Sequence, residues 1–121
     1  MPKLSLQRIP FTVDADNRLR MLKGRTGITP NILCRMGFCL SLAEAGTPIP
    51  PSPDAKPGRE INRYTLLGEY DTAFLALLAA RLSRDEEPCD ELDSSFVAHM
   101  NRGVDLLSAR VRTLSDIGEL V

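Results

Sequence analysis

The sequence predicts a single, mainly α-helical domain that opens with a short strand. Residues 18–42 read as a basic helix, a tight turn and a nearly all-apolar helix. Residues 70–82 and 92–111 carry apolar side chains at helical spacing, whereas residues 3–9 alternate polar and apolar side chains for most of their length. The chain has 121 residues, which is enough for one domain with a hydrophobic core.

The first predicted element is a strand over Lys3–Ile9 that ends at Pro10. Its period of two places Leu4 and Leu6 on one face. The next segment offers no partner strand, so we expect a two-stranded ribbon formed with a second copy of the chain. A frayed N-terminal arm is the alternative.

Two helices joined by a tight turn follow. Thr12 or Asp14 can cap the first helix, because each side chain can accept a hydrogen bond from a free backbone N–H of the first turn. Gly27 can end this helix, since a residue without a Cβ adopts a positive φ at little cost. Thr29 can cap the second helix, and Pro30 then occupies its first position, where no N–H is needed.

The second helix is too apolar to be covered on one side only. Arg35 is its only charged residue before Glu44, so other elements or a second copy of the chain should surround it. The residues expected at an oligomer interface are Leu4 and Leu6 of the strand and Met36 and Leu40 of this helix.

A proline-rich loop divides the chain. Residues 46–58 hold five of the nine prolines, so neither a helix nor a paired strand is expected there. We therefore expect a strand-helix-helix part over residues 1–45, this loop, and a helical part over residues 59–121, all within one domain. Residues 59–66 alternate around apolar side chains and predict a short extended segment.

Charge is distributed unevenly, although the formal net charge is only −1. Residues 1–45 carry seven Lys or Arg and three acidic residues, a net charge of +4; residues 46–121 carry eight and thirteen, a net charge of −5. A basic front half indicates a polyanionic partner, and two ordinary solvated faces are the alternative. Aromatic residues make up 5% of the chain, which argues against a base-stacking surface.

The sequence does not indicate catalysis. His99 is the only histidine, and the nearby Ser95 and Asp105 are weak support for a base and nucleophile. No phosphate-binding loop or dinucleotide motif is present, so we expect neither an enzyme nor a cofactor. The three cysteines lack metal-ligand spacing and fit small buried hydrophobes in a reducing compartment; they are Cys34, Cys39 and Cys89.

No signal peptide or membrane-spanning run is apparent, so we expect a cytoplasmic protein. The order strand, helix, turn, helix is that of ribbon-helix-helix proteins, in which the paired strands of two copies enter the major groove of DNA. In this plan the N-terminus of the second helix, here residues 29–32, commonly meets a phosphate.

Four stretches of the chain resemble the DndE family of DNA sulfur modification proteins. The resemblance runs almost from end to end and is weakest in the proline-rich loop and in residues 84–95. The stretches are KLSLQRI (3–9), NRLRMLKGRTGITPNILCRMGFCLSL (17–42), INRYTLLGEYDTAFLALL (61–78) and VAHMNRGVDLL (97–107).

This resemblance implies a ribbon-helix-helix variant that assembles as a homotetramer and binds nicked double-stranded DNA through a basic surface. It implies a non-catalytic part in the bacterial system that replaces a non-bridging phosphate oxygen of DNA with sulfur. The implied protein partners are a cysteine desulfurase, an iron–sulfur protein and an ATPase. Because they belong to the matching motifs and the basic half, the expected DNA-binding residues are Lys3, Arg18, Arg20, Lys23 and Arg25.

The family's DNA surface is described as lysine-rich, whereas this chain has only three lysines. Arginine can serve in their place, because its planar fork binds phosphate in a bidentate manner. Two other functions fit the sequence. The strand-helix-helix order also suits a sequence-specific repressor, and the acidic residues 85–93 with the apolar second helix suit an assembly scaffold that binds proteins and not DNA.

Overall fold

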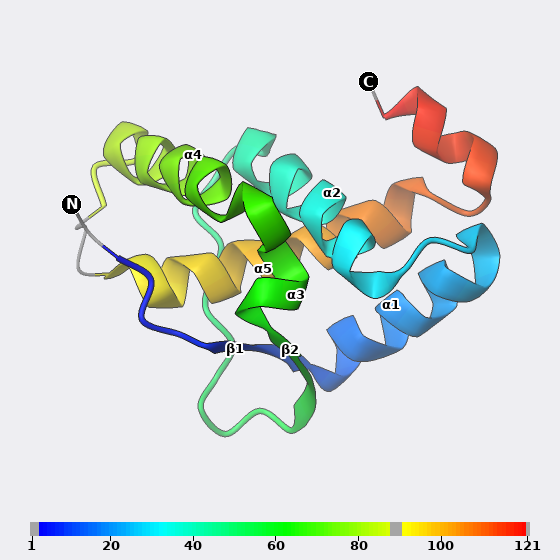
Figure 1. Ribbon diagram of the computed structural model, residues 1–121, viewed down its shortest axis with the longest axis horizontal. Helices are drawn as coiled ribbons and strands as arrows, with labels where there is room; N and C mark the ends of the chain where they lie inside the picture. Colours follow the sequence, from blue (N-terminus) through cyan, green and yellow to red (C-terminus); the bar gives the residue numbers. More distant parts are fainter. Residues whose placement is uncertain (1–2, 88–90, 121) are drawn as a thin grey trace.

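The computed structural model describes residues 3–87 and 91–120, and it is mainly helical, as predicted (Figure 1). Its strands pair in one short antiparallel sheet. In chain order the elements are β1 (Arg8–Thr12), α1 (Val13–Thr26), α2 (Pro30–Ala43), β2 (Pro57–Asn62), α3 (Arg63–Leu67), the 3-10 helix η1 (Gly68–Tyr70), α4 (Asp71–Arg84), α5 (Leu92–Arg110) and the 3-10 helix η3 (Leu114–Glu119).

Helix α5 is the axis of the fold, and α1, α2, α4 and the sheet pack around it (Figure 1). The closest approach is between α2 and α5, where a Cβ on Gly37 would lie 2.6 Å from the backbone oxygen of Gly103. Beside this crossing, the ring of Phe38 lies 5.8 Å from that of Phe74 and 5.2 Å from that of Phe96. The apolar α2 is therefore buried largely by other elements of its own chain.

The helix ends around the turn between α1 and α2 lie where the sequence predicts them, although Thr29 makes no side-chain cap hydrogen bond. Thr12 caps α1, and its hydroxyl accepts a hydrogen bond from the N–H of Ala15 at 3.1 Å. Gly27 ends α1 with φ +76°, and its N–H donates to the carbonyl of Lys23 at 2.8 Å. Pro30 is the first residue of α2. The sequence thus determined both helix boundaries through local interactions.

The predicted strand is shifted and its predicted partner is wrong. The strand covers Arg8–Thr12, and it pairs with β2 of the same chain, with Ile9 opposite Ile61. Pro10, expected to end the strand, lies within it. This is tolerated because Pro10 has no N–H to leave unpaired, and its carbonyl accepts from the side chain of Asn101 on α5 at 3.3 Å.

The proline-rich loop supplies the start of that second strand. β2 begins at Pro57, so the last two residues of the predicted loop belong to this strand, and Pro57 pairs with Thr12. The extended segment predicted for residues 59–66 ends at Asn62, whose side chain accepts a hydrogen bond from the N–H of Tyr64 at 2.8 Å. That cap starts α3 and turns the chain toward α4.

Candidate nucleic-acid interface

Helix α1 exposes basic side chains on both flanks of its buried stripe, and these side chains together make up its basic face. Its apolar residues Leu19 and Leu22 are fully buried, whereas Arg20, Lys23 and Arg25 are exposed. This split follows from the helical period, because residues three and four apart share a face. Four of the five predicted DNA-binding cations thus belong to one helix, with Arg18 half-buried at its edge.

Two of these cations are held by acidic partners. The Nε atom of Arg18 lies 3.1 Å from a carboxylate oxygen of Asp105, and its guanidinium donates to the hydroxyl of Ser108 at 3.2 Å. The Nε atom of Arg20 lies 3.4 Å from the carboxylate of Asp16, a group that Arg59 also binds at 2.8 Å. Arg18 and Arg20 therefore offer less free positive charge than their number suggests.

The last turn of α1 carries the least neutralised charge. Neither Lys23 nor Arg25 forms an ion pair with any residue that the structure describes, and both side chains are exposed. They lie beside the turn that leads into α2, where Thr29, Asn31 and Ile32 are at least partly exposed. This end of the molecule is the strongest candidate for a phosphate-binding surface.

The start of α2 itself is only partly suited to bind an anion. Pro30 has no N–H to offer. The hydroxyl of Thr29 does not cap the helix; it donates instead to the side-chain oxygen of Asn31 at 2.6 Å. The side-chain amide of Asn31 in turn donates to the carbonyl of Thr65 at 3.3 Å. The N–H groups of the first turn are therefore left without a side-chain cap.

Lys3 does not join this surface. Its side chain is exposed and lines a shallow pocket with Arg63 and Asp71, at the α4 side of the molecule. Figure 1 places the dark blue start of the described chain and the end of α1 at opposite ends of the view. The sequence grouped Lys3 with the α1 cations through the matching motifs and the basic front half, and the fold separates them.

The residues predicted at an oligomer interface are also separated. Leu4 is 3% exposed within the chain's own core, so little of it is left to face another copy. Leu6, Met36 and Leu40 are partly buried at the edge of that core. Of the four predicted interface residues, only Leu6, Met36 and Leu40 therefore keep accessible side-chain surface that another copy of the chain could contact.

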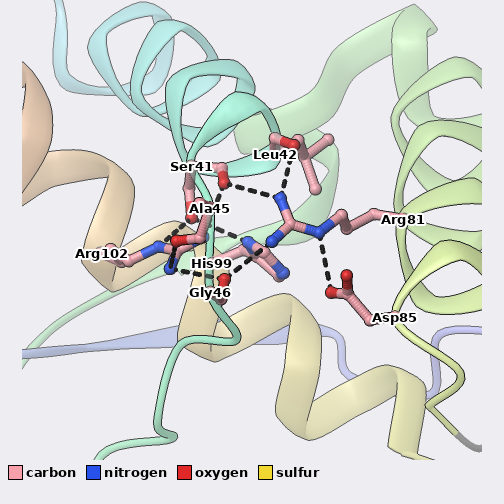
Figure 2. Close-up of polar contacts among 8 residues, drawn as sticks. All are labelled: Ser41, Leu42, Ala45, Gly46, Arg81, Asp85, His99 and Arg102. Carbon is pink, nitrogen blue, oxygen red and sulfur yellow. Dashed lines mark hydrogen bonds and ion pairs between the residues drawn. The ribbon is translucent and has the colours of Figure 1, made fainter.

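His99, the one histidine of the chain, belongs to a polar cluster at the end of α2 (Figure 2). The Nδ1 atom of buried His99 lies 2.7 Å from the hydroxyl of Ser41, which also accepts from Nε of Arg102 at 2.8 Å. The Ser41 hydroxyl and the Nδ1 atom of His99 share one hydrogen bond, whose direction follows the tautomer of the ring. Burial, with Arg102 and Arg81 nearby, lowers the pKa of His99 to about 4. Its partner is thus neither Ser95 nor Asp105.

The same cluster anchors the proline-rich loop. Arg81 donates to the carbonyls of Leu42 at 2.6 Å and Gly46 at 2.7 Å, while its Nε binds Asp85 at 2.7 Å. Arg102 donates to the carbonyl of Gly46 at 2.9 Å. These bonds satisfy the carbonyl groups left unpaired at the end of α2. The serine and histidine are enclosed within this network, so their contact is structural and does not make a nucleophile and base open to substrate.

The described residues contain no cluster of three or more His, Cys, Asp or Glu side chains placed to hold a metal ion. Burial raises the pKa of the Cys34 thiol to about 12, which fits the predicted role of a small hydrophobe. Cys39, by contrast, is exposed; Cys89 lies outside the described residues. None of the helices in the described part of the chain has the length and apolar character needed to cross a membrane.

The fold and this surface define a small helical protein that presents a cationic helix end. Comparison with known families is more specific: the family model described as DNA sulphur modification protein DndE matches residues 8–115, so the chain belongs to the DndE family. A comparison with curated proteins finds no match.

Two solved structures share the fold. The crystal structure of DndE from Escherichia coli B7A, involved in DNA phosphorothioation modification, is 26% identical with a TM-score of 0.66, and the match covers 87% of this chain and 99% of that chain. A glycine-to-lysine mutant of DndE is 23% identical with a TM-score of 0.65 and the same coverage. The second match bears on the fold alone.

Proposed function

We propose that this chain is a non-catalytic, DNA-binding component of a DNA phosphorothioation system, and that it binds double-stranded DNA, preferentially nicked, through the basic face of α1. One observation carries the proposal: Lys23 and Arg25 are exposed at the end of α1 and make no ion pair with a described residue. Cations left in this state release counterions from DNA when they neutralise phosphates. The chain belongs to a family of DNA sulphur modification proteins, and this membership supports DNA as the polyanionic partner.

The pairing of β1 with β2 favours contact through α1 over contact through a ribbon. A ribbon-helix-helix repressor pairs equivalent strands of two copies and reads bases with them. Here one edge of β1 is taken by β2, and Asn101 binds the other edge through the N–H of Thr12 at 3.0 Å. We therefore propose backbone-dominated binding, in which phosphates are contacted and nick preference arises from the flexibility of the duplex.

We also propose that the catalytic steps are carried out by partner proteins and not by this chain. Within one system, the sulfur chemistry would belong to a cysteine desulfurase, an iron–sulfur protein and an ATPase, and this chain would hold the DNA. A homo-oligomer, in the form of a tetramer, would present several α1 surfaces to one duplex, which raises the effective concentration of each. If nuclease treatment leaves the association with those proteins intact and the purified chain binds no DNA, the scaffold function replaces this one.

The test is a titration of the purified chain against intact and nicked duplexes of one sequence at several salt concentrations. We expect tighter binding to the nicked duplex, with affinity that falls steeply as salt rises. The double variant Lys23→Gln and Arg25→Gln should lower the slope of log affinity against log salt by about 2, because each neutralised phosphate contributes about 0.9. Lys56→Gln in the proline-rich loop is the matched control. Binding that ignores salt, or that the α1 variant leaves unchanged, would contradict the proposed surface.

A further inference from the structure

Helices α1 and α5 run alongside each other in the same direction. The N–H of Thr12, just before α1, donates to the side chain of Asn101 at 3.0 Å. Further along, Arg18 of α1 contacts Asp105 and Ser108 of α5 at 3.1 and 3.2 Å. Both contacts advance together along the two helices, so the helices are parallel. Figure 1 accordingly shows the end of α1 and the connection from α5 to η3 at the same end of the molecule.

We call the line of contact between α1 and α5 the seam. The charge along this seam changes from mixed to basic. In its first half, burial raises the pKa of Asp105, with Arg18 opposing the shift and Asp14 adding to it, so two carboxylates face one guanidinium there. Beyond that point α1 contributes Lys23 and Arg25. The seam therefore repels a polyanion near its start and attracts one near its end.

Arg112 reaches this end from the other side of the seam. It follows Ser108 by four residues and lies just past the last residue of α5, with an exposed side chain. Arg25 follows Arg18 by seven residues, or about 10 Å along a helix. Since Arg18 touches Ser108, both arginines lie beyond that contact and at the same end of the molecule. The carboxylate of Asp116 accepts the backbone N–H groups of Arg112 and Thr113 at 2.8 and 3.1 Å, and no ion pair among the described residues joins it to the guanidinium of Arg112.

We propose that Arg112 is a further phosphate-binding residue, and that it and Arg25 form a clamp from two elements on the backbone of duplex DNA. This inference rests on the proposed function, which it extends to the C-terminal part of the chain. Each strand of a duplex presents a phosphate about every 3.4 Å along its axis, so two guanidinium groups at one helix end can hold neighbouring phosphates. Arginine suits this task because its planar fork binds phosphate oxygens in pairs.

The test compares Arg112→Gln, Arg25→Gln and the double variant with the wild-type chain, by titration of one nicked duplex at four salt concentrations. Each single variant should lower the salt slope by about 1 and the double variant by about 2. Arg112→Lys should keep the slope near that of the wild type while weakening the affinity, because the charge remains and the fork is lost. Arg84→Gln, an exposed arginine at the end of α4, is the matched control.

The outcomes separate this inference from the function beneath it. If Arg112→Gln matches the wild type in slope and affinity while Arg25→Gln weakens binding, the clamp is wrong and the α1 surface stands. If the wild-type chain binds no duplex at any salt concentration, both are wrong. Thermal melts of each variant exclude unfolding as the cause, since the fold uses the backbone of Arg112 and leaves its side chain exposed.

Discussion

At the residue scale, His99 shows how burial decides the state of a titratable group. Its side chain is 1% exposed and lies near the guanidinium groups of Arg81 and Arg102, which lower its pKa. The carboxylate of Asp85 opposes this shift and has the smallest influence on the pKa. The neutral ring fits this site because its Nδ1 atom can accept from the hydroxyl of Ser41 at 2.7 Å. A protonated ring would add a third positive charge to the cluster.

This geometry predicts a loss of stability in mild acid. The pKa of His99 is about 4 in the folded chain and 6.5 ordinarily, so the unfolded chain binds the extra proton first. Stability should therefore be complete above pH 6.5, fall as the pH drops below that value, and level off below pH 4. The expected loss between pH 7.5 and 5 is about 2 kcal/mol of unfolding free energy. Urea titrations at the two pH values measure it.

The control for that prediction is His99→Asn, which retains an acceptor near the Nδ1 position but cannot take up a proton in this range. Its stability should depend less on pH between 7.5 and 5 than that of the wild type. Arg63 holds the pKa of Asp71 below its ordinary 3.8, and that of Asp116 is held below 3.8 by the N–H groups it accepts, so neither titrates in this interval. An equal pH dependence in wild type and variant would exclude His99 as the source.

At the element scale, the crossing of α2 and α5 depends on two glycines. A Cβ on Gly37 would lie 2.6 Å from the backbone oxygen of Gly103 and 3.1 Å from the backbone nitrogen of Val104. Backbone atoms of a helix cannot rotate away as a side chain can. The two helices must then separate, which would open the packing around Phe38 on one side of the crossing.

We expect Gly37→Ala to lower the free energy of unfolding by roughly 3 kcal/mol, at the upper end of the range for overpacked cores. Gly24→Ala is the matched control: it lies in α1, where the added methyl group would meet nothing from the rest of the fold within 4 Å, and it should gain up to about 1 kcal/mol from helix propensity. Circular dichroism melts of both variants decide the matter. If Gly37→Ala is as stable as the wild type, the close crossing is not a constraint on the fold.

Elements set by neighbouring residues were predictable, and those set by distant ones were not. Thr12, Gly27 and Pro30 determine the ends of α1 and α2 through bonds within a few residues, so their sequence signals were sufficient. The partner of β1 comes from beyond the proline-rich loop, and no local pattern joins Ile9 to Ile61. The missing partner was therefore assigned, wrongly, to a second copy of the chain.

At the scale of the whole molecule, the same limit applies to the candidate site. The sequence indicated a basic front half, and α1 does present four of the five predicted cations. Lys3 lies beside Arg63 and Asp71, where it lines a pocket with residues of α4. Arg112 joins the proposed phosphate-binding surface only because α1 and α5 pack in parallel. Composition and periodicity do not predict that packing.

Helices α2 and α4 also leave large apolar side chains exposed, and we name the outer surface of these two helices the α2/α4 face. Phe38 and Phe74 bring the two helices together. Three large apolar or aromatic side chains of α2, α4 and the preceding η1 remain 44–51% exposed, namely Ile32, Tyr70 and Leu77. Partly buried Met36 and Leu40, predicted at an oligomer interface, lie on the same α2 helix. A second copy of the chain is the occupant that we propose for this face.

Leu77→Glu tests that proposal without disturbing the core. Because Leu77 is 50% exposed, a carboxylate there stays hydrated in a separated protomer but would be desolvated in an interface. Light scattering should therefore give an oligomer for the wild type and the protomer mass of 13.3 kDa for the variant, with unchanged circular dichroism. Leu114→Glu, 57% exposed on η3, should remain oligomeric. If the Leu77→Glu variant remains an oligomer, the interface lies elsewhere. Several linked α1 surfaces bind one duplex more tightly than a single surface does. A variant that dissociates should therefore also bind DNA more weakly.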